Sequence, residues 1–383
     1  MNGRSAAHES AVPPLRLVAW EITRSCMLSC RHCRAAAHHG PYEGELSTEE
    51  CMRFIDALAE MGSCIVILTG GEPMLRKDIY RIAKYGNDRG LRMVMAPCGL
   101  LLDRETCVRL LEAGIARISL SIDGATAQSH DAFRGVPGAF DGVMRGIDAA
   151  REAGLPFQIN TTVTRSNLAE LPDIFQLAID KGAVSFHPFL LVPTGRGEEL
   201  RHEVISAADY ERTLRWIHSL QQDTPIMIKP TCAPHYYRIA AQAGTAVGKQ
   251  HPHGHPVKHS ELNTTTKGCL GGQGFVFVSH TGKVQICGFL PLEAGDLRKS
   301  DFDFSSIWRE SELFREVRDI DAYHGKCGWC EYRKVCGGCR ARAYAVDGDY
   351  LGEEPYCLYN PKRPVEETVH HEGHEGKNRK QAG

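Results

Sequence analysis

Residues 15–33 read LRLVAWEITRSCMLSCRHC, an apolar run of strand length followed at once by three cysteines. The run LRLVAWEI (15–22) is continuous, which is typical of a strand buried on both faces of a parallel sheet. Cys26, Cys30 and Cys33 form a CxxxCxxC triplet directly after it. Ligands of α/β folds bind where parallel strands end, so the triplet stands at a position suited to function.

The alternation of strand and helix continues to residue 222. Further apolar runs predict strands over 64–68, 91–96, 116–122, 156–164 and 183–192. Helical spacing and capping signals predict helices over 47–61, 77–90, 103–114, 139–154, 167–182 and 206–222. Six consecutive βα units imply a parallel sheet with right-handed crossovers. This periodicity fits both a partial (β/α)6 barrel and an open Rossmann-like sheet. Farther along, 275–287 predicts two strands around a turn, and 305–318 predicts one amphipathic helix.

A second motif, Thr69-Gly70-Gly71-Glu72-Pro73, follows the second predicted strand. The glycines allow close backbone approach to a ligand, and Glu72 can accept hydrogen bonds from a ligand ammonium group. Three thiolates within eight residues can bind one cubane iron–sulfur cluster and leave its fourth iron open. The alternative is a zinc knuckle closed by a fourth ligand, His32 or His38.

The cysteine triplet after strand one, with GGEP after strand two, resembles the radical S-adenosylmethionine (SAM) enzymes over residues 15–230. The resemblance implies an α/β fold with a partial (β/α)6 TIM-like barrel. It also implies a radical-generating [4Fe–4S] cluster on Cys26, Cys30 and Cys33, with SAM on the open iron. SAM cleavage then yields a 5′-deoxyadenosyl radical that abstracts hydrogen from a substrate.

The same resemblance implies a set of SAM-binding residues. His32 would lie near the adenine, and the others stand at strand ends or in adjacent loops: Gly70, Gly71, Glu72, Pro73, Ser121, Asp123, Arg134 and Asn160. Ordinary turn and cap roles are the alternative for Ser121, Asp123, Arg134 and Asn160.

Seven cysteines crowd the last third of the chain: Cys269, Cys287, Cys327, Cys330, Cys336, Cys339 and Cys357. Their spacing resembles the SPASM-type extension of some radical SAM enzymes, which carries auxiliary [4Fe–4S] clusters. The resemblance implies one cluster on Cys327, Cys330, Cys336 and Cys357. It implies another on Cys269, Cys287 and Cys339, for which Cys232 can supply a fourth ligand. The usual extra cysteine near Cys269 is missing, so one or two auxiliary clusters remain open. A zinc ribbon is the rival interpretation.

Longer stretches, among them FRGVPGAFDG, LLVPTGRG and KCGWCEYRKVCGGCRARAYAVDGDYLGEEPYC, resemble the haem b synthases of the sirohaem-dependent haem pathway over roughly 15–360. The resemblance implies oxygen-independent oxidative decarboxylation of two propionates of iron-coproporphyrin III, with a reductant such as a flavodoxin or ferredoxin. Alternatives are a didecarboxysirohaem deacetylase, a haem d1 side-chain enzyme, a peptide-modifying SPASM enzyme and a non-catalytic iron–sulfur carrier.

A substrate with four carboxylates calls for cations in its pocket, and arginine binds carboxylate through a two-pronged fork. Arg196 follows the sixth predicted strand and is the best placed cation. His235 and Tyr236 are candidates for contact with the macrocycle. The remaining candidate cations are Lys229, Arg238, Arg340 and Arg342.

The composition is that of a globular protein with near-balanced charge. The 383 residues include 45 Lys+Arg and 47 Asp+Glu, a net charge of −2, which argues against nucleic-acid or membrane-surface binding. The N-terminal residues contain no signal peptide, and no apolar run reaches the roughly 20 residues of a membrane span, so we expect a cytoplasmic protein. The expected segments are a flexible arm (1–14), the barrel (15–240), a Gly/His-rich loop (241–268), a SPASM-like domain (269–360) and a disordered tail (361–383).

Overall fold

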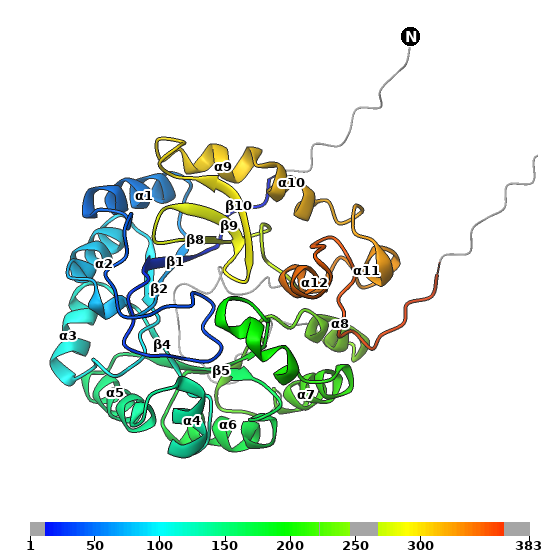
Figure 1. Ribbon diagram of the computed structural model, residues 1–383, viewed down its shortest axis with the longest axis horizontal. Coiled ribbons are helices and arrows are strands. Elements are labelled where there is room, and N and C mark those ends of the chain that lie inside the picture. The colour runs from blue at the N-terminus through cyan, green and yellow to red at the C-terminus, as the bar shows by residue number, and fades with distance from the viewer. Residues whose placement is uncertain (1–11, 222, 246–266, 364–383) are drawn as a thin grey trace, which may run out of the picture.

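The computed structural model describes residues 12–221, 223–245 and 267–363 (Figure 1). The predicted arm, the Gly/His-rich loop and the tail lie almost entirely outside these described residues. Within them, no helix combines the length and the apolar character that a bilayer crossing requires.

One ten-stranded sheet runs through the molecule in the order β10-β9-β8-β1-β2-β3-β4-β5-β6-β7. Its central strands are β1 (Leu17–Thr23), β2 (Ile65–Gly70), β3 (Arg92–Met95), β4 (Ile118–Ser121), β5 (Phe157–Val163), β6 (Ser185–Leu190) and β7 (Met227–Ile228). All of these neighbours pair in parallel. The six predicted strands are therefore confirmed, and the two-residue β7 adds an edge that the sequence did not indicate.

Helices form a ring outside the strands (Figure 1). The major ones are α1 (Thr48–Glu60), α2 (Ile79–Asp88), α3 (Arg104–Glu112), α5 (Ala139–Ala153), α6 (Leu171–Asp180) and α7 (Ala207–Leu220). Shorter elements are η1 (Pro73–Leu75), α4 (Ala127–Arg134), η2 (Leu168–Glu170), η3 (Gly195–Glu203) and α8 (His235–Gln242). The predicted capping box is present, because Ser47 and Glu50 bond each other's backbone at the start of α1. This ring of βα units is the predicted partial barrel.

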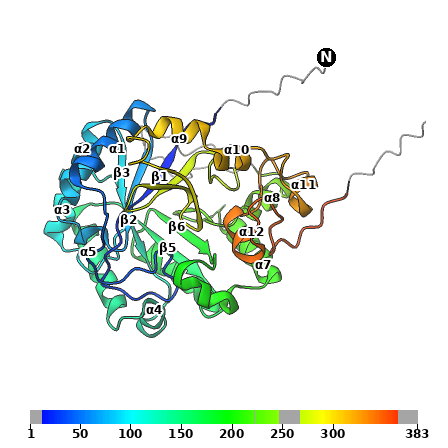
Figure 2. The same ribbon diagram turned by 45° about the horizontal axis from the view of Figure 1, so that its top comes forward.

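The C-terminal third continues the same sheet (Figure 2). Strand β8 (Phe275–Val278) pairs in parallel with β1, and β9 (Lys283–Cys287) and β10 (Leu290–Asp296) follow in antiparallel order. The predicted single helix over 305–318 is wrong. It is two helices, α9 (Phe304–Glu310) and α10 (Glu312–Arg318), because Ser311 takes an extended ψ of 128°. Two short helices, α11 (Gly325–Trp329) and α12 (Arg340–Asp347), carry the remaining cysteine-rich segment.

Alternation of side chains along the strands separates an outer from an inner face. On β4, Ile118 and Leu120 are fully buried in the core that the helices share, whereas Ser119 and Ser121 are half-buried. Because successive strand residues point to opposite faces, the half-buried set lies on the inside of the barrel. Each fully buried aliphatic side chain contributes roughly 1.5–3 kcal/mol to folding, so the outer face holds the barrel together and leaves the inner face to polar groups.

Candidate active site

The three cysteines of the CxxxCxxC triplet lie together in the loop after β1. Cys26 and Cys30 are buried and Cys33 is half-buried, and all three belong to one apolar cluster with Leu28 and Ala37. The Leu28 N–H donates to Cys26 Sγ at 3.4 Å and the Ala37 N–H donates to Cys33 Sγ at 3.3 Å. Hydrogen bonds of this kind stabilise cluster-bound thiolates.

These cysteines fit an iron–sulfur cluster by their chemistry. All three are free thiols in the structure. Burial raises the pKa of the Cys26 thiol to about 11, so a bound metal is needed to keep this group as a thiolate at neutral pH. Arg134 Nη1 lies 3.6 Å from Cys30 Sγ and supplies a positive charge beside this sulfur.

Arg196 fixes the cysteine loop from outside. Its Nε donates to the Cys30 carbonyl at 2.9 Å and its Nη1 donates to the Ala37 carbonyl at 2.6 Å. The neighbouring Gly195 has a φ of +59°, and a Cβ there would stand 2.2 Å from the Arg34 carbonyl. Two arms of the guanidinium are therefore engaged by protein backbone, and Nη2 is buried with no partner among the described residues, so binding of substrate by Arg196 stays a prediction.

The TGGEP segment packs against the same loop. A Cβ at Gly70 would stand 2.1 Å from the Thr23 carbonyl, and one at Gly71 would stand 2.3 Å from the Ser25 carbonyl. The close approach is thus to protein backbone, where the sequence predicted a ligand. The Glu72 carboxylate also binds protein backbone. It is fully buried and accepts hydrogen bonds from the N–H groups of Met74 at 3.0 Å and Cys98 at 2.6 Å.

Each carboxylate oxygen accepts one of these bonds and keeps a further lone pair, so the contact of Glu72 with a ligand ammonium stays a prediction. Burial raises the pKa of Glu72 above its ordinary value. Pro73 begins η1, whose cap is the Glu72 side chain. The motif therefore acts by holding the end of β2 against the chain that leads to the cysteines.

Five of the predicted SAM contacts lie on the cysteine loop, on strands β4 and β5 or in the segments that follow β4. The His32 ring stacks on Phe133 with centroids 4.4 Å apart, and burial lowers the pKa of His32 to about 4, so the ring is neutral. Asp123 Oδ2 lies 2.5 Å from Arg134 Nη2 in a buried ion pair, and Asp123 Oδ1 accepts from the Thr162 N–H at 2.6 Å. Ser121 and Asn160 pair in register on the adjacent strands β4 and β5.

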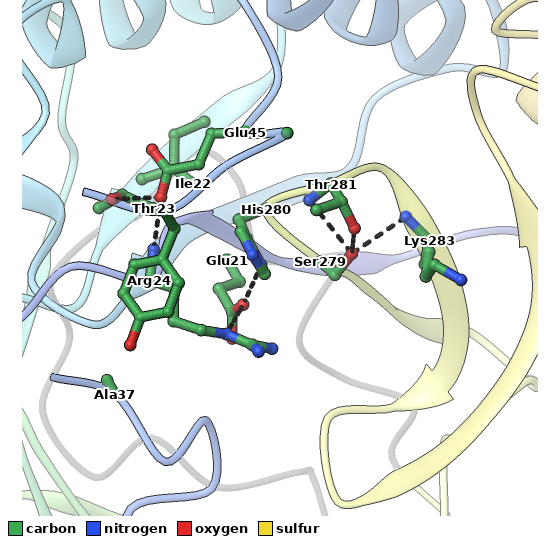
Figure 3. Close-up of polar contacts among 12 residues, drawn as sticks. Glu21, Ile22, Thr23, Arg24, Ala37, Glu45, Ser279, His280, Thr281 and Lys283 are labelled. Carbon is green, nitrogen blue, oxygen red and sulfur yellow. Dashed lines mark hydrogen bonds and ion pairs between the residues drawn. The ribbon is translucent and has the colours of Figure 1, made fainter. Parts of the chain in front are cut away.

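A polar network that the sequence analysis missed ties this loop to the C-terminal strands (Figure 3). Glu21, at the end of β1, is fully buried and lies 2.7 Å from His280 Nδ1 in the β8–β9 turn. It also pairs with Arg24 at 3.1 Å and Arg34 at 2.5 Å. Burial alone would raise the pKa of Glu21, but His280 and the two arginines hold it at about 2. The signal available in the sequence was one carboxylate inside an apolar strand.

The C-terminal cysteines fall into two sets of four. Cys327, Cys330, Cys336 and Cys357 line one pocket beside α8. Burial raises the pKa of both Cys232 and Cys287, and the nearby thiols of Cys269 and Cys339 raise it further, so these four cysteines lie near one another. This placement is compatible with the ligand sets that the resemblance implies, in which Cys232 can supply the fourth ligand of the second set; the ligand roles stay predictions.

The predicted zinc sites find no geometric support. Among the residues that the structure describes, no three His, Cys, Asp or Glu side chains are arranged to hold a single metal ion. A cubane cluster is much wider than one ion, so its ligands stand farther apart. Each four-cysteine set therefore fits a cluster by number and chemistry, as the triplet does.

Two predicted substrate contacts lie elsewhere. His235 is 2% exposed and lines the pocket of the first cysteine set, away from the triplet. Tyr236 is also 2% exposed and packs against Tyr237 and His218. Both side chains are thus almost fully covered by protein, and their contact with a macrocycle stays a prediction.

Comparison with known proteins places this arrangement in a family. Residues 20–178 match the Radical SAM superfamily. The AdoMet-dependent heme synthase of Nitratidesulfovibrio vulgaris is 52% identical over 368 residues, covering 95% of this chain and 99% of that protein. The AdoMet-dependent heme synthase of Methanosarcina barkeri is 52% identical over 346 residues, covering 90% and 97%.

Among solved structures, Streptococcus suis SuiB bound to the precursor peptide SuiA superimposes with a TM-score of 0.69 at 17% identity, covering 91% of this chain and 76% of that one. At that identity the likeness concerns the fold alone. The chain belongs to the radical SAM superfamily, whose members use a [4Fe–4S] cluster and SAM, and within it to the family of the AdoMet-dependent heme synthases.

Proposed function

We propose that this chain makes haem b by oxidative decarboxylation of two propionates of iron-coproporphyrin III to vinyl groups. The observation that carries the proposal is similarity along the whole chain. The 52% identity to an AdoMet-dependent heme synthase spans the barrel and both cysteine sets. A common radical-generating barrel alone would leave the substrate open, because one fold hosts many reactions.

The proposed reaction balances without oxygen. When bound, SAM and the clusters supply the hydrogen-abstracting radical and a route for electrons. Each reacting propionate loses one hydrogen atom from the carbon next to the ring, then CO2 and one electron, which leaves a vinyl group. Two propionates thus consume two SAM molecules and release two electrons to an acceptor.

The chain's own residues set the conditions for this chemistry. The neutral His32 ring, stacked on Phe133, offers an apolar surface suited to a nucleobase. The buried Asp123–Arg134 pair keeps a fixed charge distribution beside Cys30. Fixed dipoles and charges of this kind stabilise changing charge without reorganising. A flavodoxin- or ferredoxin-type protein is the proposed source of reducing electrons.

An anaerobic assay with iron-coproporphyrin III, SAM and dithionite tests the proposal. We expect a monovinyl intermediate and then haem b, each step lowering the mass of the free acid by CO2 plus two hydrogens, one from the carbon next to the ring and one from the carboxyl group. Loss of acetate units from didecarboxysirohaem would instead identify a deacetylase. SAM cleavage with no vinyl product would overturn the substrate assignment, and modification of a peptide would favour a peptide-modifying enzyme.

Two cysteine variants separate the cluster roles. Cys30→Ala should abolish SAM cleavage, because it removes a ligand of the proposed radical-generating cluster. Cys327→Ala should leave SAM cleavage in place and stop vinyl formation, because it removes an auxiliary ligand. Full turnover by both variants would overturn the proposed division of labour.

A further inference from the structure

The inner face of the barrel carries a row of polar side chains that the proposed SAM site does not use up. The register places Ser121 beside Asn160 and Asn160 beside His187. Pairing of β6 with β7 puts Lys229, which directly follows β7, level with His187. These four half-buried residues therefore lie level with one another, in one row that crosses the sheet from Ser121 on β4, beside the proposed SAM site, to Lys229 at the end of β7.

Two cations on this face have no counter-charge among the described residues. Lys229 and Arg117, the residue just before β4, are half-buried, and neither forms an ion pair there. Burial lowers the pKa of both, and the nearby charge of Arg92 lowers that of Arg117 further. Placing cations in a partly buried site without an anion is costly, so a bound anion would be stabilised.

His187 adds an unused hydrogen-bond donor within electrostatic range of both cations. Burial, followed by the charges of Lys229 and Arg117, holds the pKa of His187 far below its ordinary value, so the ring is neutral. Its Nδ1 lies 3.2 Å from Gln158 Nε2, an amide nitrogen that can only donate. The proton therefore sits on Nε2, which is buried and has no partner among the described residues.

The other cations considered for substrate already bind protein groups, although Arg196 Nη2 and the Nε atoms of Arg238 and Arg340 have no partner among the described residues. Arg196 binds loop carbonyls, and Arg238 pairs with Glu211. Arg342 pairs with Glu354 and donates to the Cys232 carbonyl, and Arg340 donates to the Tyr350 and Gly352 carbonyls. Lys229 alone of the original candidates remains without a partner in the described chain.

We infer that Arg117, His187 and Lys229 form a binding site for substrate carboxylates, a step that rests on the proposed function. Two of the four propionates survive the proposed reaction and need fixed anchors. The other two propionates react, and they must reach the end of this row at Ser121, beside the proposed SAM site. Three strand spacings separate Ser121 from Lys229, about 14 Å at ~4.8 Å each. An extended macrocycle can thus be anchored at one end and react at the other.

Binding measurements on the reconstituted holoenzyme test this site directly. Iron-coproporphyrin III is titrated into SAM-loaded protein and followed by the shift of its Soret band. Lys229→Gln and Arg117→Gln should each weaken binding by about 10- to 100-fold, the range expected for one hydrogen bond to a charged group. The control Lys84→Gln removes an equal charge from the exposed outer face of α2 and should bind like wild type.

Three further readouts keep the outcomes apart. Substrate-free SAM cleavage and iron content should stay at wild-type level in both variants, which excludes misfolding. The tetramethyl ester of iron-coproporphyrin III should bind wild type and Lys229→Gln equally weakly, and Lys229→Arg should restore binding of the free acid.

The alternative outcomes are distinct. Wild type that binds and converts the substrate while both Gln variants match it would overturn the carboxylate site and leave the proposed function intact. Wild type that neither binds nor converts the substrate would overturn the proposed function itself.

Discussion

Replacing Arg196 by methionine separates a loop-fixing role from a substrate-binding one. The change keeps the bulk of the side chain and removes two donors, at 2.9 Å to Cys30 O and 2.6 Å to Ala37 O. Hydrogen bonds that involve a charged group contribute about 1.5–3 kcal/mol each, so the loop loses about 3–6 kcal/mol. Even the lower figure raises the population of the displaced loop about 100-fold.

We therefore expect Arg196→Met to bind less iron at the triplet and to form less 5′-deoxyadenosine, both in the absence of porphyrin. The assay measures iron and sulfide per chain, the electron paramagnetic resonance signal of the reduced cluster, and substrate-free SAM cleavage. Arg201→Met is a matched control from the same element, because Arg201 is exposed and donates only to the Ala345 carbonyl. Normal iron content and SAM cleavage combined with weak porphyrin binding would refute the loop-fixing role.

Three other changes test separate parts of the structure. Gly71→Ala should lower stability by about 1–3 kcal/mol in thermal unfolding, because its Cβ would stand 2.3 Å from the Ser25 carbonyl; an unchanged midpoint would contradict the close packing. Cys232→Ala should lower iron content by about four per chain, one cluster's worth, whereas no loss would remove Cys232 from the second set. Glu21 has a folded pKa of about 2 against an ordinary 4.5, so its contribution to stability is present above pH 4.5 and is lost as the pH falls toward 2. The stability gap between wild type and Glu21→Gln in urea unfolding should shrink over that window, and a constant gap would contradict the buried ion network.

The parts of the fold that local patterns encode could be read from the sequence. The six predicted parallel strands are rich in apolar residues, and their ends lie within two residues of the predicted ones. The break at Ser311 was not predictable, because apolar spacing runs through it and only the backbone turns there. Helix α4 and strand β10 were missed because each is short and half-polar, and tertiary contacts rather than periodicity hold them.

In the candidate site, too, the residue types could be predicted from the sequence, whereas their interaction partners could not. Spacing singled out the triplet as cluster ligands, because metal ligation imposes its own sequence pattern, whereas the grouping of the C-terminal thiols came from the family resemblance. The expected substrate, with its carboxylates, also predicted a cation near the last barrel strands, but the sequence did not show which residue supplies it. Arg196 and Lys229 look alike in sequence, and only the path of the cysteine loop shows that Arg196 is engaged and Lys229 is not.

The shared sheet has a consequence for how the two cysteine regions are held. Strand β8 pairs with β1, so the segment that leads to Cys287 is bonded directly to the strand that leads to the triplet. Arg34, the residue after Cys33, pairs with Glu21 and lies over the Phe277 ring at 4.3 Å. Its side chain would also meet a Cβ at Gly288 at 2.9 Å.

One arginine therefore bridges the loop of the triplet to the turn that follows Cys287. In the proposed reaction, hydrogen removal and electron release must occur on the same substrate side chain in succession. A hinge between two separate domains would let the distance between those events vary. Here one sheet carries both cysteine regions, and the buried Glu21 carboxylate binds Arg24, Arg34 and His280. These contacts hold the two regions at a constant separation.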